Sequence, residues 1–186
     1  LVLAAFVGIA AIGQTLVILL GGIDLSIPFI IGFGNVVAAE LTGKGVPFWQ
    51  TLLFILVLAG LIGALNGSLS SRLNIHPLIL TLGVGNAVQG AVLLWTRGLP
   101  AGSVPPGLPG FVSIGATLGL FPFPALVLLW LILTIAITVM LQRTVYGRHI
   151  YALGSNPVAA RLALVRPTLI WTATFTLSAM FAALAG

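Results

Sequence analysis

Long apolar runs separated by short polar or glycine-rich segments dominate the pattern along the chain. A membrane-spanning helix needs about 20 mostly apolar residues, with about 17–25 tolerated. Six runs meet this requirement: 1–20, 27–43, 49–70, 77–95, 122–142 and 168–186. The segment from Leu52 to Leu58 is apolar at every position and lacks the alternation of membrane β-strands. The pattern therefore predicts an all-α polytopic integral membrane protein, with a helical bundle of about six spans.

Glycine and proline predict where the helices break. The charge-free stretch from Gly98 to Gln142 is too long for one helix, and its first half is rich in both residues. It therefore predicts a loop over roughly 96–121, with room for a short re-entrant piece. Gly21 and Gly22 predict a second break, after which Ser26 is a favoured N-cap type and Pro28 suits a first helical turn.

The composition agrees with a membrane environment. The chain is 60% hydrophobic and only 5% charged, whereas soluble domains have roughly 45–50% apolar and about 25% charged residues. A chain with so few charges cannot cover itself with a polar surface, so much of its surface is expected to face lipid.

Candidate chemistry is sparse. The absence of cysteine excludes disulfides and thiolate metal sites, and the two histidines, His76 and His149, stand apart, so no metal site is expected. No catalytic triad, carboxylate pair or glycine-rich phosphate-binding motif with its lysine is present. An enzyme active site is therefore not expected, and neither is a cofactor bound to this chain.

The seven basic residues form no dense patch, which argues against a nucleic-acid partner, and their distribution predicts a topology instead. If the 143–167 loop is cytoplasmic, the 71–76 loop lies on the same side, and together they hold five arginines. Lys44 and Arg97 then fall on the opposite side with 96–121. Because cytoplasmic loops carry an excess of Lys and Arg, this five-to-two asymmetry favours that orientation.

Several polar side chains fall within or beside the spans, and they are candidates for a translocation path: Asp24, Asn66, Thr81, Asn86 and Gln89. Asp24 has two interpretations, a residue of an ordinary interhelical turn or a functional ionisable group at a helix break inside the bundle. The uncharged residues are explained either by interhelical hydrogen bonds or by a path for a neutral, polyhydroxylated solute. Asn86 and Gln89 are three apart and therefore share a helix face.

Small residues recur at helix-packing spacing in two spans. They are Gly60, Ala64 and Gly67 in the third run, and Ala179, Ala183 and Gly186 in the last. Such residues allow helices in lipid to approach closely, so tight packing is the favoured interpretation, and a pore-lining role is the alternative.

The segment 143–164 is the most specific in the chain. Asn156 is a strong N-cap type, and Pro157 suits the first turn of a short helix over 156–164 that ends before Pro167. Two helical turns are not stable alone in water, so something must dock this element. The short helix could dock either into a groove of a partner protein or onto the membrane surface.

This segment resembles the cytoplasmic coupling segment of ribose-type (simple-sugar) permeases of ATP-binding-cassette (ABC) importers, which reads roughly Thr-x-Phe/Tyr-Gly-Arg-x-Ile-Tyr-Ala-x-Gly-x-Asn-x-x-Ala-Ala-Arg-Leu. The matching residues are Thr144, Tyr146, Gly147, Arg148, Ile150, Tyr151, Ala152, Gly154, Asn156, Ala159, Ala160, Arg161 and Leu162. Gly21 to Ser26 and Asn74 to Gly83 resemble two further signatures of the family, in the expected order. The resemblance covers essentially the whole chain.

The resemblance implies a permease subunit of a binding-protein-dependent importer in a bacterial-type cytoplasmic (inner) membrane. It implies ABC ATPase subunits that carry ATP and Mg²⁺, a second permease, an extracytoplasmic binding protein and membrane lipid as partners. The expected solute is a pentose or hexose, moved by alternating access. An ABC permease for branched-chain amino acids or nucleosides, and an ion-gradient-driven secondary carrier, remain as alternatives.

The coupling segment of the family maps onto Gly147, Arg148, Tyr151, Gly154, Asn156, Ala159, Ala160, Arg161 and Leu162. Because Ala159 and Ala160 are small, both are expected to allow close approach of an ATPase. We expect residues 1–186 to form a single transmembrane domain of a longer protein, with further spans at one or both ends.

Overall fold

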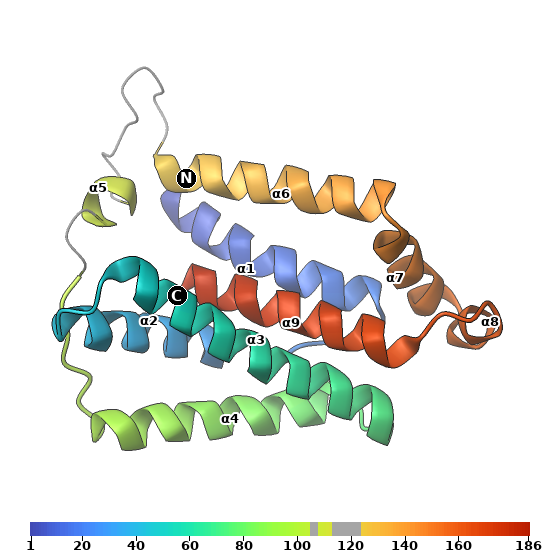
Figure 1. The fold of residues 1–186 in the computed structure, drawn as a ribbon, viewed down its shortest axis with the longest axis horizontal. Helices are drawn as coiled ribbons and strands as arrows, with labels where there is room; N and C mark the ends of the chain where they lie inside the picture. The colour runs from blue at the N-terminus through green and yellow to red at the C-terminus, as the bar shows by residue number, and fades with distance from the viewer. Residues whose placement is uncertain (105–107, 113–123) are drawn as a thin grey trace.

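The computed structural model describes residues 1–104, 108–112 and 124–186, and every regular element within them is a helix (Figure 1). This confirms the predicted all-α class. The helices are α1 (Val2–Leu19), α2 (Ile27–Gly43), α3 (Phe48–Leu73), α4 (Pro77–Thr96), α5 (Leu108–Val112), α6 (Ala125–Arg143), α7 (Val145–Ser155), α8 (Pro157–Leu162) and α9 (Pro167–Ala185).

Each of the six predicted spans corresponds to a helix with similar bounds. Five of them, α1, α3, α4, α6 and α9, are long and apolar enough to cross a membrane. The sixth, α2, is apolar but shorter, because the chain after α1 runs without helical structure before α2 begins. The predicted span over 122–142 starts at two residues outside the described part of the chain and is helical from Ala125.

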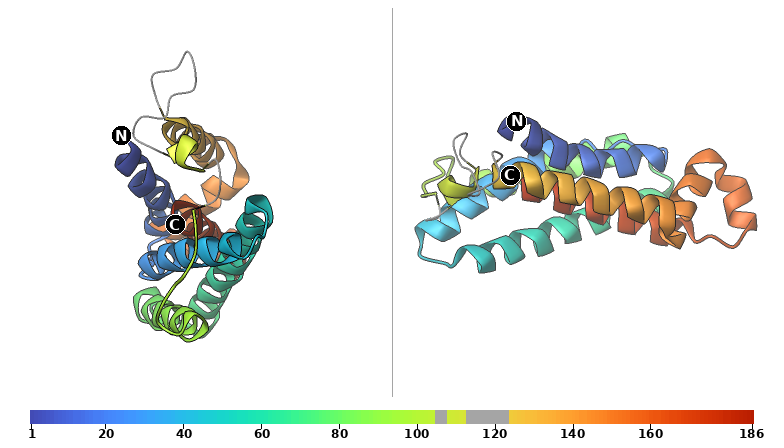
Figure 2. Two further views of the ribbon diagram at one scale, coloured as in Figure 1. Left: turned by 90° about the vertical axis from the view of Figure 1, so that its left-hand side faces the viewer. Right: turned by 90° about the horizontal axis from the view of Figure 1, so that it is seen from above.

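Helix α9 is the centre of the bundle. It packs against α3, α1 and α2, and Figures 1 and 2 show α6 beyond α1 on one side and α4 on the other. Its own Phe175 is fully buried among these neighbours. The last helix of the chain therefore joins elements that precede it by more than 100 residues.

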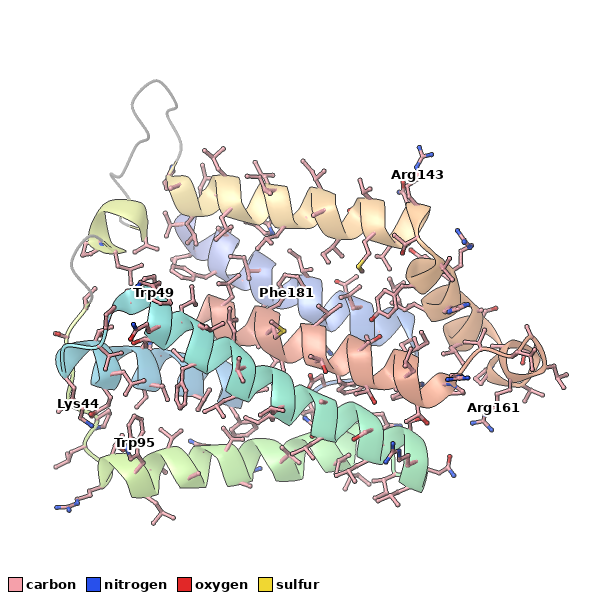
Figure 3. The ribbon with its side chains drawn as sticks, viewed as in Figure 1. Lys44, Trp49, Trp95, Arg143, Arg161 and Phe181 are labelled. Carbon is pink, nitrogen blue, oxygen red and sulfur yellow. The ribbon has the colours of Figure 1, made fainter. Side chains whose placement is uncertain are left out.

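The two ends of the bundle carry different charges. Helices α7 and α8 lie at one end, with the α3–α4 turn, and the α2–α3 turn lies at the other (Figure 1). We call the first the α7–α8 end; Arg143 and Arg161 are there, whereas Lys44 is at the opposite end (Figure 3). The structure thus groups 143–167 with 71–76, and the assignment of this end to the cytoplasm stays a prediction.

The predicted loop over 96–121 is described only in part. Residues 99–104 have no regular structure and α5 is a helix of five residues, whereas 105–107 and 113–121 lie outside the described residues. The described part is tied to α2: Ala101 N donates to Glu40 Oε1 at 2.7 Å, and Thr42 Oγ1 donates to the Ser103 carbonyl at 3.0 Å. These bonds keep this segment at the end opposite α7 and α8.

Helices α3 and α9 approach so closely at Gly63 and Gly67 that any larger residue there would collide with α9. A Cβ added to Gly63 would lie 2.8 Å from the Ala179 Cβ, and one added to Gly67 would lie 2.7 Å from the Thr172 Cα. Gly60 is different, because its added Cβ would meet only Met180 and Thr176 side-chain atoms at 3.6 Å or more. The predicted small-residue packing is therefore present, but it runs through Gly63 and Gly67.

The small residues of α9 serve two neighbours. Ala179 faces α3, whereas Ala183 and Gly186 lie against α2, where their backbones approach Gly34 and Ile31. Close packing against two helices at once explains why the C-terminal half of α9 is so rich in alanine.

We expect cysteines introduced at Ser103 and Ser155 to be labelled from opposite faces of the membrane, because the two residues lie at opposite ends of the bundle. The chain has no cysteine of its own, so each variant carries a single thiol. The measurement is labelling of sealed, oriented vesicles with a membrane-impermeant maleimide. Labelling of both thiols from one face would contradict this topology.

We expect Gly63→Ala to destabilise the bundle and Gly60→Ala to have little effect. The new methyl group at position 63 would force α3 away from α9, and overpacking of this kind typically costs about 1–3 kcal/mol. The measurement is the thermal unfolding midpoint of the full-length protein in detergent. Equal midpoints for the two variants would show that the α3–α9 contact is looser than described.

Candidate functional site

The segment between α1 and α2 runs without helical structure through the bundle. Gly21 has a φ of +88°, a left-handed conformation that ends α1 and favours glycine. The N–H groups of Gly21 and Gly22 donate back to Ile18 and Val17 carbonyls at 2.9 Å, so the turn satisfies its own backbone. The predicted break is therefore real, and it brings Asp24 inside the protein.

Asp24 is the centre of a buried hydrogen-bond cluster, and its side chain is only 3% exposed. Its Oδ1 accepts hydrogen bonds from Ser26 N at 2.9 Å and Ser26 Oγ at 2.5 Å. Its Oδ2 accepts from Ser178 Oγ of α9 at 3.0 Å. The carboxyl group therefore joins the start of α2 to the central helix.

Two further helices contribute to the same cluster. Asn66 Nδ2 of α3 donates to Ser26 Oγ at 3.2 Å, and Leu25 N donates to Thr81 Oγ1 of α4 at 2.9 Å. Asn66 and Thr81 are fully buried. The structure thus brings together three of the predicted path residues, Asp24, Asn66 and Thr81, and connects α2, α3, α4 and α9 around them. We call these residues, with Ser26 and Ser178, the Asp24 cluster.

Asp24 has no basic partner in the described part of the chain, where the one ion pair joins Lys44 to Glu40 at 3.4 Å. Its carboxyl group lies instead beside the N-terminus of α2, whose partial positive charge favours a carboxylate. Three donated hydrogen bonds add to this stabilisation. The buried Asp24 carboxyl group is therefore stabilised by uncharged hydrogen-bond donors and by the N-terminus of α2, not by a basic side chain.

One polar atom of the cluster is left without a partner. The Asn66 Oδ1 is buried and accepts no hydrogen bond from the described residues. An unpaired buried acceptor costs free energy, and such atoms gather where a ligand or a change of conformation supplies the missing donor. The cluster therefore has one unused acceptor for a hydroxyl or amide group.

The prediction that Ser26 is the N-cap residue of α2 is confirmed. Its hydroxyl makes no cap bond to α2, however, and donates to Asp24. The hydroxyl oxygen of Ser26, which would accept a cap bond, instead accepts a hydrogen bond from Asn66 Nδ2 at 3.2 Å.

Asn86 and Gln89 lie apart from the Asp24 cluster. Both are exposed on α4, and Asn86 Nδ2 donates to the Leu82 carbonyl of its own helix at 2.8 Å. The shared face predicted from their spacing exists, but it is the outer face of the bundle within the described residues. The structure therefore does not join them to the other three path residues.

A hollow of about 680 Å³ lies between α2, α3 and α4, towards the end opposite α7 and α8. Its lining is apolar except for Gln50 and Thr51. An apolar wall cannot replace the water hydrogen bonds of a polyhydroxylated solute. The Asp24 cluster is therefore the better candidate for polar chemistry.

The 143–164 segment forms two helices. Asn156 caps α8 as predicted: its Oδ1 accepts from Val158 N at 3.1 Å and from Ala159 N at 3.0 Å. Helix α7, which the motif alone did not predict, precedes it and buries Gly147, Ile150 and Leu153. The short α8 is therefore held by its cap and by its contact with α7.

The structure divides the predicted coupling residues into two groups. Gly147 and Ala160 are buried, whereas Gly154 is exposed but lies against α1, because an added Cβ would collide with the Leu19 carbonyl. The expectation that Ala160 offers close approach to a partner is thus wrong, since it is only 3% exposed. The other exposed members are Arg148, Tyr151, Asn156, Ala159, Arg161 and Leu162.

Helix α7 packs onto the end of α1, and α8 packs against α7. Ala160 and Leu153 belong to the same apolar cluster as Leu20, the residue that follows α1. Asp24 is only four residues beyond Leu20. A second connection runs from Tyr146 OH to Thr174 Oγ1 at 2.8 Å, one turn before Ser178 on α9. Both connections lead from α7 towards the Asp24 cluster.

Sequence reasoning did not identify two residues of these sites: Ser178 of the Asp24 cluster and Val158 of α8. Ser178 lies four residues after Thr174 on the same face of α9, and both are fully buried. That pair of polar residues on one face was the available signal. Val158 was also missed; it is 69% exposed on α8, beside Leu162, which is 82% exposed.

The sequence matches the protein family described as "Branched-chain amino acid transport system / permease component" over residues 1–186. It is 33% identical to a fructose import permease of Rhizobium meliloti over 98% of this chain and 52% of that protein. It is 34% identical to a ribose import permease of Escherichia coli over 96% of this chain and 56% of that protein.

A permease of an autoinducer 2 import system of Klebsiella pneumoniae is 35% identical over 84% of this chain and 48% of its own length. The chain therefore spans about half the length of the curated relatives it matches. No solved structure matches the chain significantly.

We expect Asp24→Ala to destabilise the bundle by about 2 kcal/mol or more, because it leaves Ser26 and Ser178 donors buried without an acceptor. Asp24→Asn keeps one acceptor oxygen and is expected to retain most of the stability. Thr51→Val is the matched control, since it removes a buried hydroxyl that has no partner among the described residues. Unfolding midpoints that agree for Asp24→Ala and Thr51→Val would show that the cluster contributes nothing.

Proposed function

The chain belongs to the family described as branched-chain amino acid transport system / permease component, and from this premise we propose that it is the membrane-embedded permease part of an ATP-driven importer. The observation that carries the proposal is the identity of 33–34% to fructose and ribose import permeases over 96–98% of the chain. The Asp24 cluster and the α7–α8 segment lie within that matched region.

We propose a monosaccharide as the solute. Sugar relatives support it, and so does the polar but uncharged character of most side chains in the Asp24 cluster. The unused Asn66 Oδ1 can accept a hydrogen bond from a sugar hydroxyl when the bundle opens. Branched-chain amino acids, which the family description names, are the second candidate.

The energy source is proposed to be ATP hydrolysis on separate ABC ATPase subunits. This chain has no glycine-rich phosphate-binding motif with its lysine, which supports a partner subunit as the place where ATP and Mg²⁺ bind. A second permease and an extracytoplasmic binding protein complete the proposed importer, in a bacterial-type inner membrane. Family membership does not favour the ion-gradient-driven carrier.

The surface proposed to dock the ATPase is the side of α8 opposite Ala160. Val158 and Leu162 are strongly exposed there, while Ala160 is buried in the apolar cluster that also contains residues of α7 and α1. Apolar side chains on a short helix at the end of a bundle suit a hydrophobic groove. This side of α8, with Val158, Ala159, Arg161 and Leu162, is called the docking face below.

We propose that movement of the docking face reaches the Asp24 cluster through two contacts. Ala160 and Leu153 share an apolar cluster with Leu20, which leads directly into the segment that holds Asp24. Tyr146 holds Thr174, which precedes Ser178 by one turn of α9. A shift of α7 would therefore act on both sides of the bond between Asp24 and Ser178, which gives the bundle a point at which to switch between two arrangements.

We expect Leu162→Asp and Val158→Asp to reduce co-purification with the ATPase at least about tenfold and to abolish ATP-dependent uptake. Each would place an unpaired carboxylate in an apolar interface, which costs several kcal/mol. The measurements are pull-down of the ATPase by the full-length protein and uptake of labelled solute into proteoliposomes that also contain the binding protein.

Val145→Asp is the matched control, because Val145 is exposed at the same end but lies outside the docking face. If all three variants behave alike, the docking face is assigned wrongly. Uptake of ribose, fructose and leucine by the parent protein tests the solute separately. Transport of leucine alone would contradict the sugar proposal and leave the docking face standing.

A further inference from the structure

A hollow of about 1030 Å³ at the α7–α8 end is lined by three arginines, Arg72, Arg161 and Arg166. It lies between the last turn of α3, the α8–α9 connection and the first turns of α9. We call it the arginine hollow. The three side chains come from positions separated by up to 94 residues, so the sequence alone shows no basic patch.

The positive charge of the hollow has no acidic counterpart in this chain. The sequence contains two acidic residues in all, Asp24 and Glu40. Asp24 is enclosed in its own cluster, and Glu40 pairs with Lys44 at the opposite end of the bundle. Within the described ranges, no hydrogen bond or ion pair engages the guanidinium groups of the three arginines. Three like charges gathered around one hollow favour an anion between them.

Guanidinium groups suit one kind of anion in particular. Their planar arrangement of N–H donors matches phosphate oxygens in a bidentate manner. The first turn of α9 adds the partial positive charge of a helix N-terminus, and Thr168 of that turn also lines the hollow. The chemistry therefore points to a phosphate group.

The position of the hollow indicates where that phosphate comes from. Helices α3 and α9 are both apolar enough to span a membrane, and the hollow is formed where they end. This is the level of lipid headgroups, and α8 extends beyond it (Figure 1). Basic pockets between the ends of membrane helices are known to bind anionic headgroups.

Two leucines of the hollow point to the same environment. Leu164 is 89% exposed and Leu169 is 62% exposed. Leu164 also has a φ of +61°, a left-handed conformation that is uncommon for leucine. Exposure of the two leucines to water and the left-handed backbone of Leu164 are both unfavourable in free energy. Contact with the upper part of an acyl chain would bury these side chains and offset that free energy.

We propose that the arginine hollow binds the phosphate group of an anionic phospholipid, with Leu164 and Leu169 against its acyl chains. The bound lipid would fasten the α8–α9 connection to the end of α3. The site lies beside the docking face and shares Arg161 with it, but its ligand is the membrane and it does not depend on transport.

The test compares lipid binding by the full-length protein in detergent, measured by native mass spectrometry with added short-chain phosphatidylglycerol or phosphatidylcholine. The variant R72Q/R161Q/R166Q removes the charge of the hollow. We expect a loss of affinity for phosphatidylglycerol of about fivefold per arginine, and about 100-fold for the three together, with phosphatidylcholine binding unchanged. Arg143→Gln, at the same end but outside the hollow, is expected to bind as the parent does.

The triple lysine variant, R72K/R161K/R166K, keeps the charge and is expected to recover part of the affinity. If the triple glutamine variant does not fold, the single variants R72Q and R166Q give the same test at about fivefold each. Phosphatidylglycerol binding equal to that of the parent would overturn the proposal. Inorganic phosphate competing as well as the lipid would also overturn it, since the site would then hold a free anion. Retained lipid binding with lost ATPase binding would assign the hollow to a protein partner instead.

Discussion

A carboxyl group buried in an apolar bundle requires hydrogen-bond donors, and the arrangement of this protein depends on how Asp24 obtains them. The donors come from the start of α2 and from Ser178 of α9, and the neighbouring Ser26 hydroxyl is in turn held by Asn66 of α3. One side chain thereby sets the relative position of three helices. An apolar contact could not do this, because apolar packing is non-directional whereas these bonds demand particular atoms at particular distances.

Glycine makes this cluster geometrically possible. Gly63 and Gly67 allow α3 to lie directly against α9, which brings Asn66 to the same level as the serines. Gly13 has the same effect for α1, because an added Cβ would lie 2.9 Å from the Ser178 backbone. The hydrogen bonds of the cluster therefore depend on the close packing of the helices. Small residues bring the backbones together, and short polar side chains can then connect them.

Periodicity and composition were sufficient for the fold class and for the positions of the helices, because a membrane span is a property of local sequence. The break at Gly21 and the Asn156 cap were predicted for the same reason. The partners of Asp24 were not, since Ser178 lies 154 residues away and nothing local marks it as the second donor. The direction of Ala160 was predicted wrongly because a six-residue helix has no periodicity from which to identify its buried side.

The distance between Asp24 and Ser178 along the chain has a consequence for biosynthesis. The two residues are separated by 154 positions, so at roughly 5–20 residues per second the ribosome needs about 8–30 seconds to reach Ser178 after it has made Asp24. Throughout that interval the Ser178 donor does not yet exist, and the donors to Asp24 come from Ser26, which is made two residues after it. The hydrogen bond that joins the start of α2 to α9 therefore cannot form until α9 has been made. The order in which these helices are made thus differs from the order in which the Asp24 cluster is assembled.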